Sequence, residues 1–169
     1  MLLFTDIISG DEVLSDAYKI VEVDDFLMEV DCQMIKIKEG DVDIGANASA
    51  EGGGDDDGVE EGEQIVNNVI YSFRLQASGF DKKGYMTYIK GYMKAVKEHL
   101  TSINSPRLAD FESKAKVAVK KILENFGDYE FYVSEGMNPD GMVLLLNYRE
   151  DGTTPYFTYW KDGLKSQKV

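Results

Sequence analysis

Residues 81–126 read DKKGYMTYIKGYMKAVKEHLTSINSPRLADFESKAKVAVKKILENF, and their apolar residues recur at the spacing of amphipathic helices. In the first half the apolar stripe comprises Tyr85, Tyr88, Ile89, Tyr92, Met93, Val96, Leu100 and Ile103. Asp81 precedes this stripe and can cap a helix, because a carboxylate accepts hydrogen bonds from the first backbone N–H groups. The segment therefore predicts a long helix after Asp81, with its three tyrosines in the buried stripe.

A second helix is predicted in the other half of this segment. Ser105 suits the N-cap position and Pro106 the first helical position. Its inner face comprises Phe111, Ala115, Ala118, Val119, Ile122, Leu123 and Phe126. Because the connection between the two helices is short, we expect an antiparallel helical hairpin over about residues 81–126.

The hairpin is basic, whereas the rest of the chain is acidic. Residues 82–121 hold ten basic and three acidic residues, a net charge of +7, while the whole chain carries −13 and the remainder therefore −20. Surfaces of opposite sign can attract different partners. Five lysines of the outer face are candidates for contact with an acidic partner: Lys90, Lys94, Lys97, Lys114 and Lys120. The alternative is a solvated face without a partner.

Short strands are predicted on both sides of the hairpin. The first 37 residues alternate apolar or β-branched runs with turns, and residues 65–75 read as another strand, although Asn67-Asn68 interrupts its pattern. After the hairpin, strands are predicted at 129–133, 142–148 and 155–161. This order predicts an α+β fold with segregated helices and strands. At 169 residues, the chain is expected to form one domain.

An acidic segment separates the first strands from the next. Residues 39–63 hold ten acidic residues, no basic residue and many glycines. Such a composition buries too little apolar surface to offset its conformational entropy, so we predict a mobile loop at about residues 40–63. Its carboxylates are candidates for weak calcium binding, in particular Asp55, Asp56, Asp57, Glu60 and Glu61. The segment lacks the ligand spacing of an EF-hand, and a solvated spacer is the alternative.

The sequence offers little catalytic chemistry. The chain has one cysteine, Cys32, and one histidine, His99, too few for a four-ligand structural zinc site or an internal disulfide. His99 falls in the lysine-rich helical pattern, where we expect an exposed position. No glycine-rich phosphate loop is present, and the acidic composition argues against specific DNA binding. We therefore expect a non-enzymatic protein without a cofactor.

No stretch approaches the roughly 20 apolar residues of a membrane helix. The first residues also lack the basic and apolar regions of a secretory signal. We expect a protein of the cytoplasm, in part associated with the cytoskeleton, and without a membrane span.

Three segments together resemble the translationally controlled tumour protein (TCTP) family. They are IGANASAE at 44–51, FYVSEGMNPDGM at 131–142 and NYREDG at 147–152, and the likeness extends over essentially the whole chain. Two residues of the second segment depart from the family pattern. Ser134 stands where the family usually has glycine, and Gly136 where it commonly has serine or asparagine. Both flank Glu135, so the local backbone there is expected to differ from that of the family.

The resemblance implies a β-tent core, like that of accessory proteins that hold nucleotide-free Rab GTPases, with a projecting helical hairpin. It also implies a cytoplasmic protein with roles in protein synthesis and ribosome association, microtubule stabilisation and calcium binding. By this resemblance tubulin is an acidic partner for the five hairpin lysines. The runner-up function is nucleotide exchange on, or stabilisation of, a Rheb-type small GTPase. By this resemblance Glu12 and Glu135 are the GTPase-facing acids, although nothing else in the sequence brings these two residues together.

Overall fold

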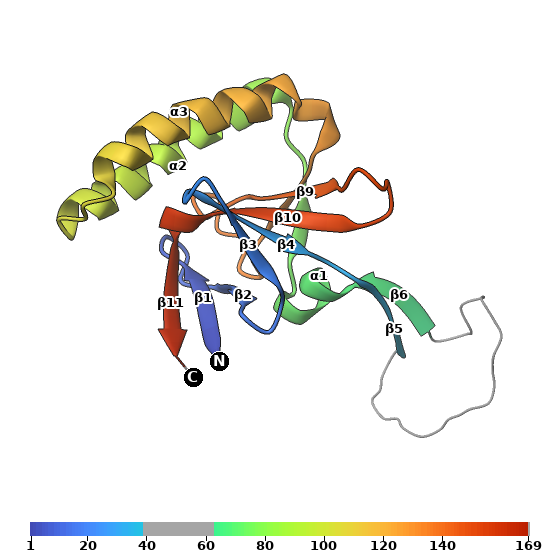
Figure 1. The fold of residues 1–169 in the computed structure, drawn as a ribbon. Helices are drawn as coiled ribbons and strands as arrows, with labels where there is room; N and C mark the ends of the chain where they lie inside the picture. The colour runs from blue at the N-terminus through green and yellow to red at the C-terminus, as the bar shows by residue number, and fades with distance from the viewer. Residues whose placement is uncertain (39–62, 169) are drawn as a thin grey trace.

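The computed structural model describes residues 1–38 and 63–168, whose strands form three antiparallel sheets (Figure 1). One sheet has the strand order β11-β1-β2, the largest has the order β3-β4-β10-β9-β8-β7, and β5 pairs with β6. The strands are β1 (Leu2–Asp6), β2 (Glu12–Ser15), β3 (Ile20–Val23), β4 (Leu27–Asp31), β5 (Met34–Lys38), β6 (Glu63–Asn67), β7 (Gln76–Ser78), β8 (Glu130–Val133), β9 (Leu144–Tyr148), β10 (Pro155–Trp160) and β11 (Leu164–Lys168).

The predicted hairpin is confirmed as α2 (Lys82–Ser102) and α3 (Leu108–Glu124), which lie side by side with their tip beyond the strands (Figure 1). The Asp81 carboxylate caps α2 by accepting a hydrogen bond from the Gly84 N–H at 2.6 Å. The inner stripe of α2 is buried, with Tyr85, Ile89, Tyr92, Val96 and Leu100 each at most 4% exposed. The helical period in the sequence therefore predicted the correct face, except that Ile103 is 58% exposed, because the helix ends at Ser102.

Two details of the hairpin differ from expectation. The second helix begins at Leu108 instead of Pro106, because residues 105–107 form a turn. In that turn the Ser105 hydroxyl accepts a hydrogen bond from the Arg107 N–H at 3.1 Å. His99 is half-buried rather than exposed, since it lies at the edge of the inner stripe.

The prediction of one strand over residues 65–75 is wrong. Strand β6 ends at Asn67, and helix α1 (Asn68–Phe73) follows immediately. The Asn67 side chain causes the change, since its Oδ1 accepts hydrogen bonds from the N–H groups of Val69 at 2.9 Å and Ile70 at 3.1 Å. Arg74 ends the helix in the left-handed conformation, at φ 55°. The asparagine pair that interrupted the strand pattern was thus a helix start signal.

Strand β11 was not predicted from the sequence. It pairs with β1 over five residues, from Leu2 opposite Lys168 to Asp6 opposite Leu164. Its sequence, LKSQK, is mostly polar and exposed, so no apolar alternation marks it as a strand. The pairing partner supplies the ladder of backbone hydrogen bonds that the local sequence does not suggest.

The core lies between the largest sheet and the hairpin. The Phe26 ring contacts Trp160 of β10 and Phe111 of α3, with ring centroids 5.7 and 5.6 Å apart. The fold is a mixed α+β arrangement of several antiparallel sheets with a helical hairpin, as predicted at that level. The predicted mobile loop lies outside the described residues, except that its last residue, Glu63, begins β6.

Candidate functional site

The structure divides the five candidate lysines of the hairpin into two groups. Lys90, Lys94 and Lys120 are exposed and have no hydrogen bond or ion pair with any part of the chain that the structure describes. Lys97 forms an ion pair with Glu112 at 2.6 Å, which joins α2 to α3. The Lys114 ammonium donates a hydrogen bond to the Asp24 carbonyl at 2.6 Å. Of the five candidates, only Lys90, Lys94 and Lys120 therefore present an uncompensated charge to a partner.

Arg107, counted in the basic hairpin, instead attaches the hairpin to the strands. Its guanidinium donates to both carboxylate oxygens of Asp162 and to the Asp25 carboxylate at 2.9 Å. The Asp162 side chain is only 4% exposed. Hydrogen bonds from Lys161 and then from Arg107 lower the pKa of Asp25 to about 2. The charge of Arg107 is therefore compensated within the fold and is not available to an acidic partner.

A second candidate surface lies where the β1–β2 loop meets the loop after β8. The buried Asp6 carboxylate accepts hydrogen bonds from the N–H groups of Ile8 at 3.0 Å and Met142 at 2.8 Å, and from the Ser9 hydroxyl at 2.9 Å. One carboxylate therefore fixes the turn of its own loop and binds the second loop. Sequence reasoning missed Asp6, whose signal was the Ser9-Gly10 turn three residues later.

Asp11 makes a second connection between these loops. Its Oδ2 accepts hydrogen bonds from the Ser134 hydroxyl at 2.7 Å and the Gly136 N–H at 3.0 Å. A Cβ atom at position 136 would lie 2.8 Å from this oxygen, so glycine allows the close approach. Ser134 and Gly136, the two departures from the family pattern, are thus the residues that contact Asp11.

This contact brings the two predicted acids into one region of the surface. Glu12 follows Asp11 in the chain, and Glu135 lies between the two residues that Asp11 contacts. Both glutamates are exposed, and Glu135 lies 3.8 Å from the exposed Arg74 guanidinium. Nothing in the local sequence indicates this proximity, which depends on contact between two segments far apart in the chain.

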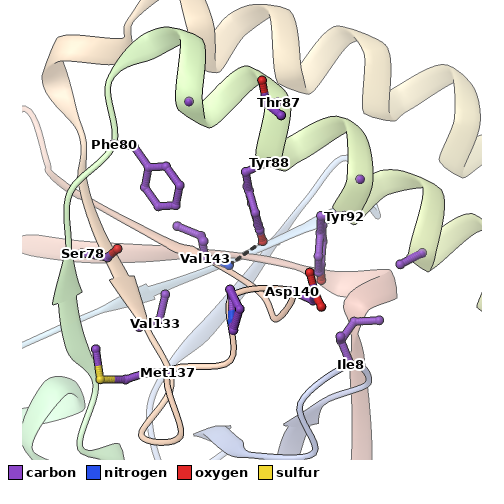
Figure 2. Close-up of a pocket in the computed structure, with 14 residues that line it drawn as sticks. Ile8, Ser78, Phe80, Thr87, Tyr88, Tyr92, Val133, Met137, Asp140 and Val143 are labelled. Carbon is purple, nitrogen blue, oxygen red and sulfur yellow. Dashed lines mark hydrogen bonds between the residues drawn. The ribbon is translucent and has the colours of Figure 1, made fainter.

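Tyr88 connects the same loop to α2. Its hydroxyl donates a hydrogen bond to the Gly141 carbonyl at 2.6 Å and accepts one from the Val143 N–H at 2.9 Å. Figure 2 shows Tyr88 and Tyr92 extending from the helix toward the loop that carries Asp140. The tyrosine stripe is therefore part of the packing between helix and loop, as the sequence predicted, and not an exposed stacking surface.

The five calcium candidates, Asp55, Asp56, Asp57, Glu60 and Glu61, lie outside the described residues. Within residues 1–38 and 63–168, no group of three or more His, Cys, Asp or Glu side chains could hold a metal ion. No helix in these two ranges is long and apolar enough to cross a membrane.

Comparison with known proteins gives the family. The family model described as "Translationally controlled tumour protein" matches residues 1–165. The chain belongs to the TCTP family. Similar members include the homologs from Debaryomyces hansenii, 58% identical with all of both chains covered, and Schizosaccharomyces pombe, 59% identical with 99% of both covered.

Two solved TCTP structures have the same fold. The protein from Schizosaccharomyces pombe superimposes with a TM-score of 0.83 at 58% identity, with all of both chains covered. The protein from Caenorhabditis elegans gives a TM-score of 0.72 at 28% identity, covering 100% of this chain and 99% of that one. The family resemblance seen in the sequence motifs is therefore confirmed over the full length.

Proposed function

We propose that this member of the TCTP family is a non-enzymatic interaction protein of the cytoplasm that binds microtubules through the outer face of its helical hairpin. The observation that carries the proposal is the set of three exposed lysines without intramolecular partners, Lys90, Lys94 and Lys120. A cationic face of this kind attracts an acidic surface over about 8–10 Å at physiological ionic strength. Roles in protein synthesis and ribosome association belong to the same proposal. In these roles the ribosome or translation factors would supply the acidic surface that binds this face.

Reversing these three charges tests the proposal. In a microtubule co-sedimentation assay, the variant Lys90→Glu/Lys94→Glu/Lys120→Glu is expected to bind at least about tenfold more weakly, because each repulsive contact costs a fraction of a kcal/mol or more. The matched control reverses three exposed lysines of the strands and their connections, Lys19, Lys165 and Lys168, and should bind normally. Equal loss in both variants would mean that net charge, and not the hairpin face, determines binding.

A second candidate function is supported by the contact between the β1–β2 loop and the loop after β8. Glu12, at the start of β2, and Glu135, in the loop after β8, are both exposed, and Asp11 joins these two segments. Two carboxylates there could accept hydrogen bonds from the phosphate-binding lysine of a nucleotide-free small GTPase of the Rheb type. The proposed likeness of the strands to the β-tent of Rab accessory proteins also favours this function.

Stopped-flow release of a fluorescent guanine nucleotide from a Rheb-type GTPase tests this second function. The wild-type protein is expected to accelerate release, and Glu12→Gln/Glu135→Gln to reduce the acceleration about tenfold, since a charge-assisted hydrogen bond contributes about 1.5–3 kcal/mol. Glu124→Gln/Glu150→Gln removes two exposed carboxylates elsewhere and serves as the control. No acceleration by the wild-type protein would exclude the exchange function. Calcium binding by the acidic segment remains a prediction.

A further inference from the structure

A groove of about 720 Å³ lies between α2 and the loop after β8. Figure 2 shows the side chains that line it, which come from α2, from β7 and the β7–α2 connection, from β8 and the loop after it, and from the β1–β2 loop. Its walls are mainly apolar, including Phe80, Val133, Met137 and Val143. The hydrogen bonds of Tyr88 to Gly141 and Val143 fix helix and loop relative to each other, so the groove is preformed.

Gly91 is a groove-lining residue in the middle of α2 that internal packing does not explain. Glycine in a helix interior is markedly less favourable than alanine. A Cβ atom at Gly91 would have no neighbour within 4 Å, whereas at Gly84 it would lie 2.7 Å from the Asp81 carboxylate. No contact within the described chain therefore requires glycine at position 91. The absence of a side chain here keeps this part of the groove open.

A row of lysines follows the helical edge of the groove. Lys83, Lys90 and Lys94 lie seven and four residues apart, with groove-lining Thr87 between the first two, so they share one side of α2. All three are exposed and have no ion pair or side-chain hydrogen bond with any described residue. The opposite edge carries the exposed Asp140. The charges therefore favour a ligand whose acidic groups lie along the helix and whose apolar part enters the groove.

We propose that this groove binds an acidic segment of a partner protein, with one aromatic or branched aliphatic side chain seated beside Gly91 and flanking carboxylates on Lys83, Lys90 and Lys94. The proposal extends the proposed function, because it shares Lys90 and Lys94 with the microtubule-binding face. It adds an apolar anchor to that face. Such an anchor gives the selectivity that exposed lysines alone do not provide.

The test uses the full chain and a fluorescein-labelled peptide in which aspartate and glutamate flank a central Trp–Leu pair. Fluorescence anisotropy is expected to show saturable binding, and ¹H–¹⁵N spectra to show shifts at the amides of Tyr88, Gly91 and Val143. Gly91→Leu should weaken binding at least about tenfold without lowering the melting temperature, because the site is open and leucine favours a helix. Ser113→Leu, on the exposed side of α3, is the control and should bind normally.

Two further peptides separate the contributions of charge and anchor. A peptide with Ser–Gly in place of Trp–Leu is expected to bind at least about tenfold more weakly, and a peptide with lysine in place of the acids should not bind in the groove. Equal binding of the Ser–Gly peptide, unchanged binding by Gly91→Leu, or shifts confined to residues outside the groove would overturn the proposal. These results would leave the microtubule proposal intact, since that one depends on co-sedimentation of the lysine variant. Conversely, if the lysine variant co-sedimented normally with microtubules, the microtubule proposal would fail. Binding of the peptide in the groove would be unaffected by that result.

Discussion

Replacing Arg107 by alanine is expected to lower the free energy of unfolding by about 3 kcal/mol, because the Asp162 carboxylate would remain buried without its partner. The Asp162 side chain is 4% exposed, whereas that of Arg107 is 30% exposed, so the cost falls mainly on the aspartate. Urea denaturation of the wild type and Arg107→Ala would measure this difference. Because Arg107 also contacts Asp25, the variant additionally loses a connection between the start of α3 and the β3–β4 turn.

Two further variants test whether the unpaired Asp162 carboxylate causes this loss of stability. Arg107→Ala/Asp162→Asn is expected to recover most of the lost stability, since no buried charge then lacks a partner. Arg107→Lys should be intermediate, because an ammonium group cannot reproduce the fork of a guanidinium. A double variant no more stable than Arg107→Ala would show that the loss comes from packing of the arginine stem instead.

The acid dependence of stability gives an independent measure of the same contacts. The folded-state pKa of Asp25 is lowered to about 2, mainly by hydrogen bonds from Lys161 and Arg107. A lowered pKa contributes stability above the unfolded-state pKa of about 3.9, and this contribution is lost as the pH falls from about 4 to 2. Arg107→Ala removes one of the two donors. The loss of stability over this pH range should therefore be smaller in the variant than in the wild type.

Replacing Gly163 by alanine is the second large expected effect, with a loss of roughly 3 kcal/mol. Gly163 lies in the short 3-10 helix after β10 and is buried against α2. A Cβ atom there would overlap the Tyr92 hydroxyl and lie 2.7 Å from the Met142 methyl group. For a chain of this size the loss corresponds to a decrease of about 6–12 °C in Tm, measurable by circular dichroism.

Tyr92→Phe tests whether the overlap with the hydroxyl is responsible. Among the described residues, the buried Tyr92 hydroxyl has no hydrogen-bond partner. An unpartnered buried hydroxyl costs about 1–3 kcal/mol, so Tyr92→Phe alone should stabilise the fold by about 1 kcal/mol. The double variant Tyr92→Phe/Gly163→Ala should be more stable than the sum of the two single effects predicts, because the hydroxyl that overlaps the alanine is absent. If the two effects on stability were strictly additive, the alanine would clash with Met142 or the backbone and not with the hydroxyl.

The hairpin was predictable because helical signals are local. Its period of apolar residues and the cap at Asp81 lie within one segment, and the buried stripe follows from that segment alone. The strand predicted at 65–75 was wrong because the Asn67 cap outweighed the β-branched composition of the next residues. Strand β11 was missed because its evidence is its pairing with β1, more than 150 residues earlier in the sequence.

The candidate sites divide in the same way. Sequence alone identified the basic hairpin and its exposed lysines, because the face on which a residue lies depends on helical spacing. It did not show that Lys97 and Lys114 are engaged while Lys90, Lys94 and Lys120 are not, since Glu112 and Asp24 approach them only in the folded chain. It also did not bring Glu12 near Glu135, which requires the hydrogen bonds of Asp11 to the loop after β8.

The family, the α+β class and the sign of charge on each segment could be predicted from the sequence, because motifs, periodicity and composition are properties of neighbouring residues. Which charges remain unpaired, which loops meet and where a groove opens became known only from the folded chain. Those features depend on the distances between residues far apart in the chain. Hydrogen bonds and ion pairs form only within a few ångströms, so their partners are known only once the fold has brought them together.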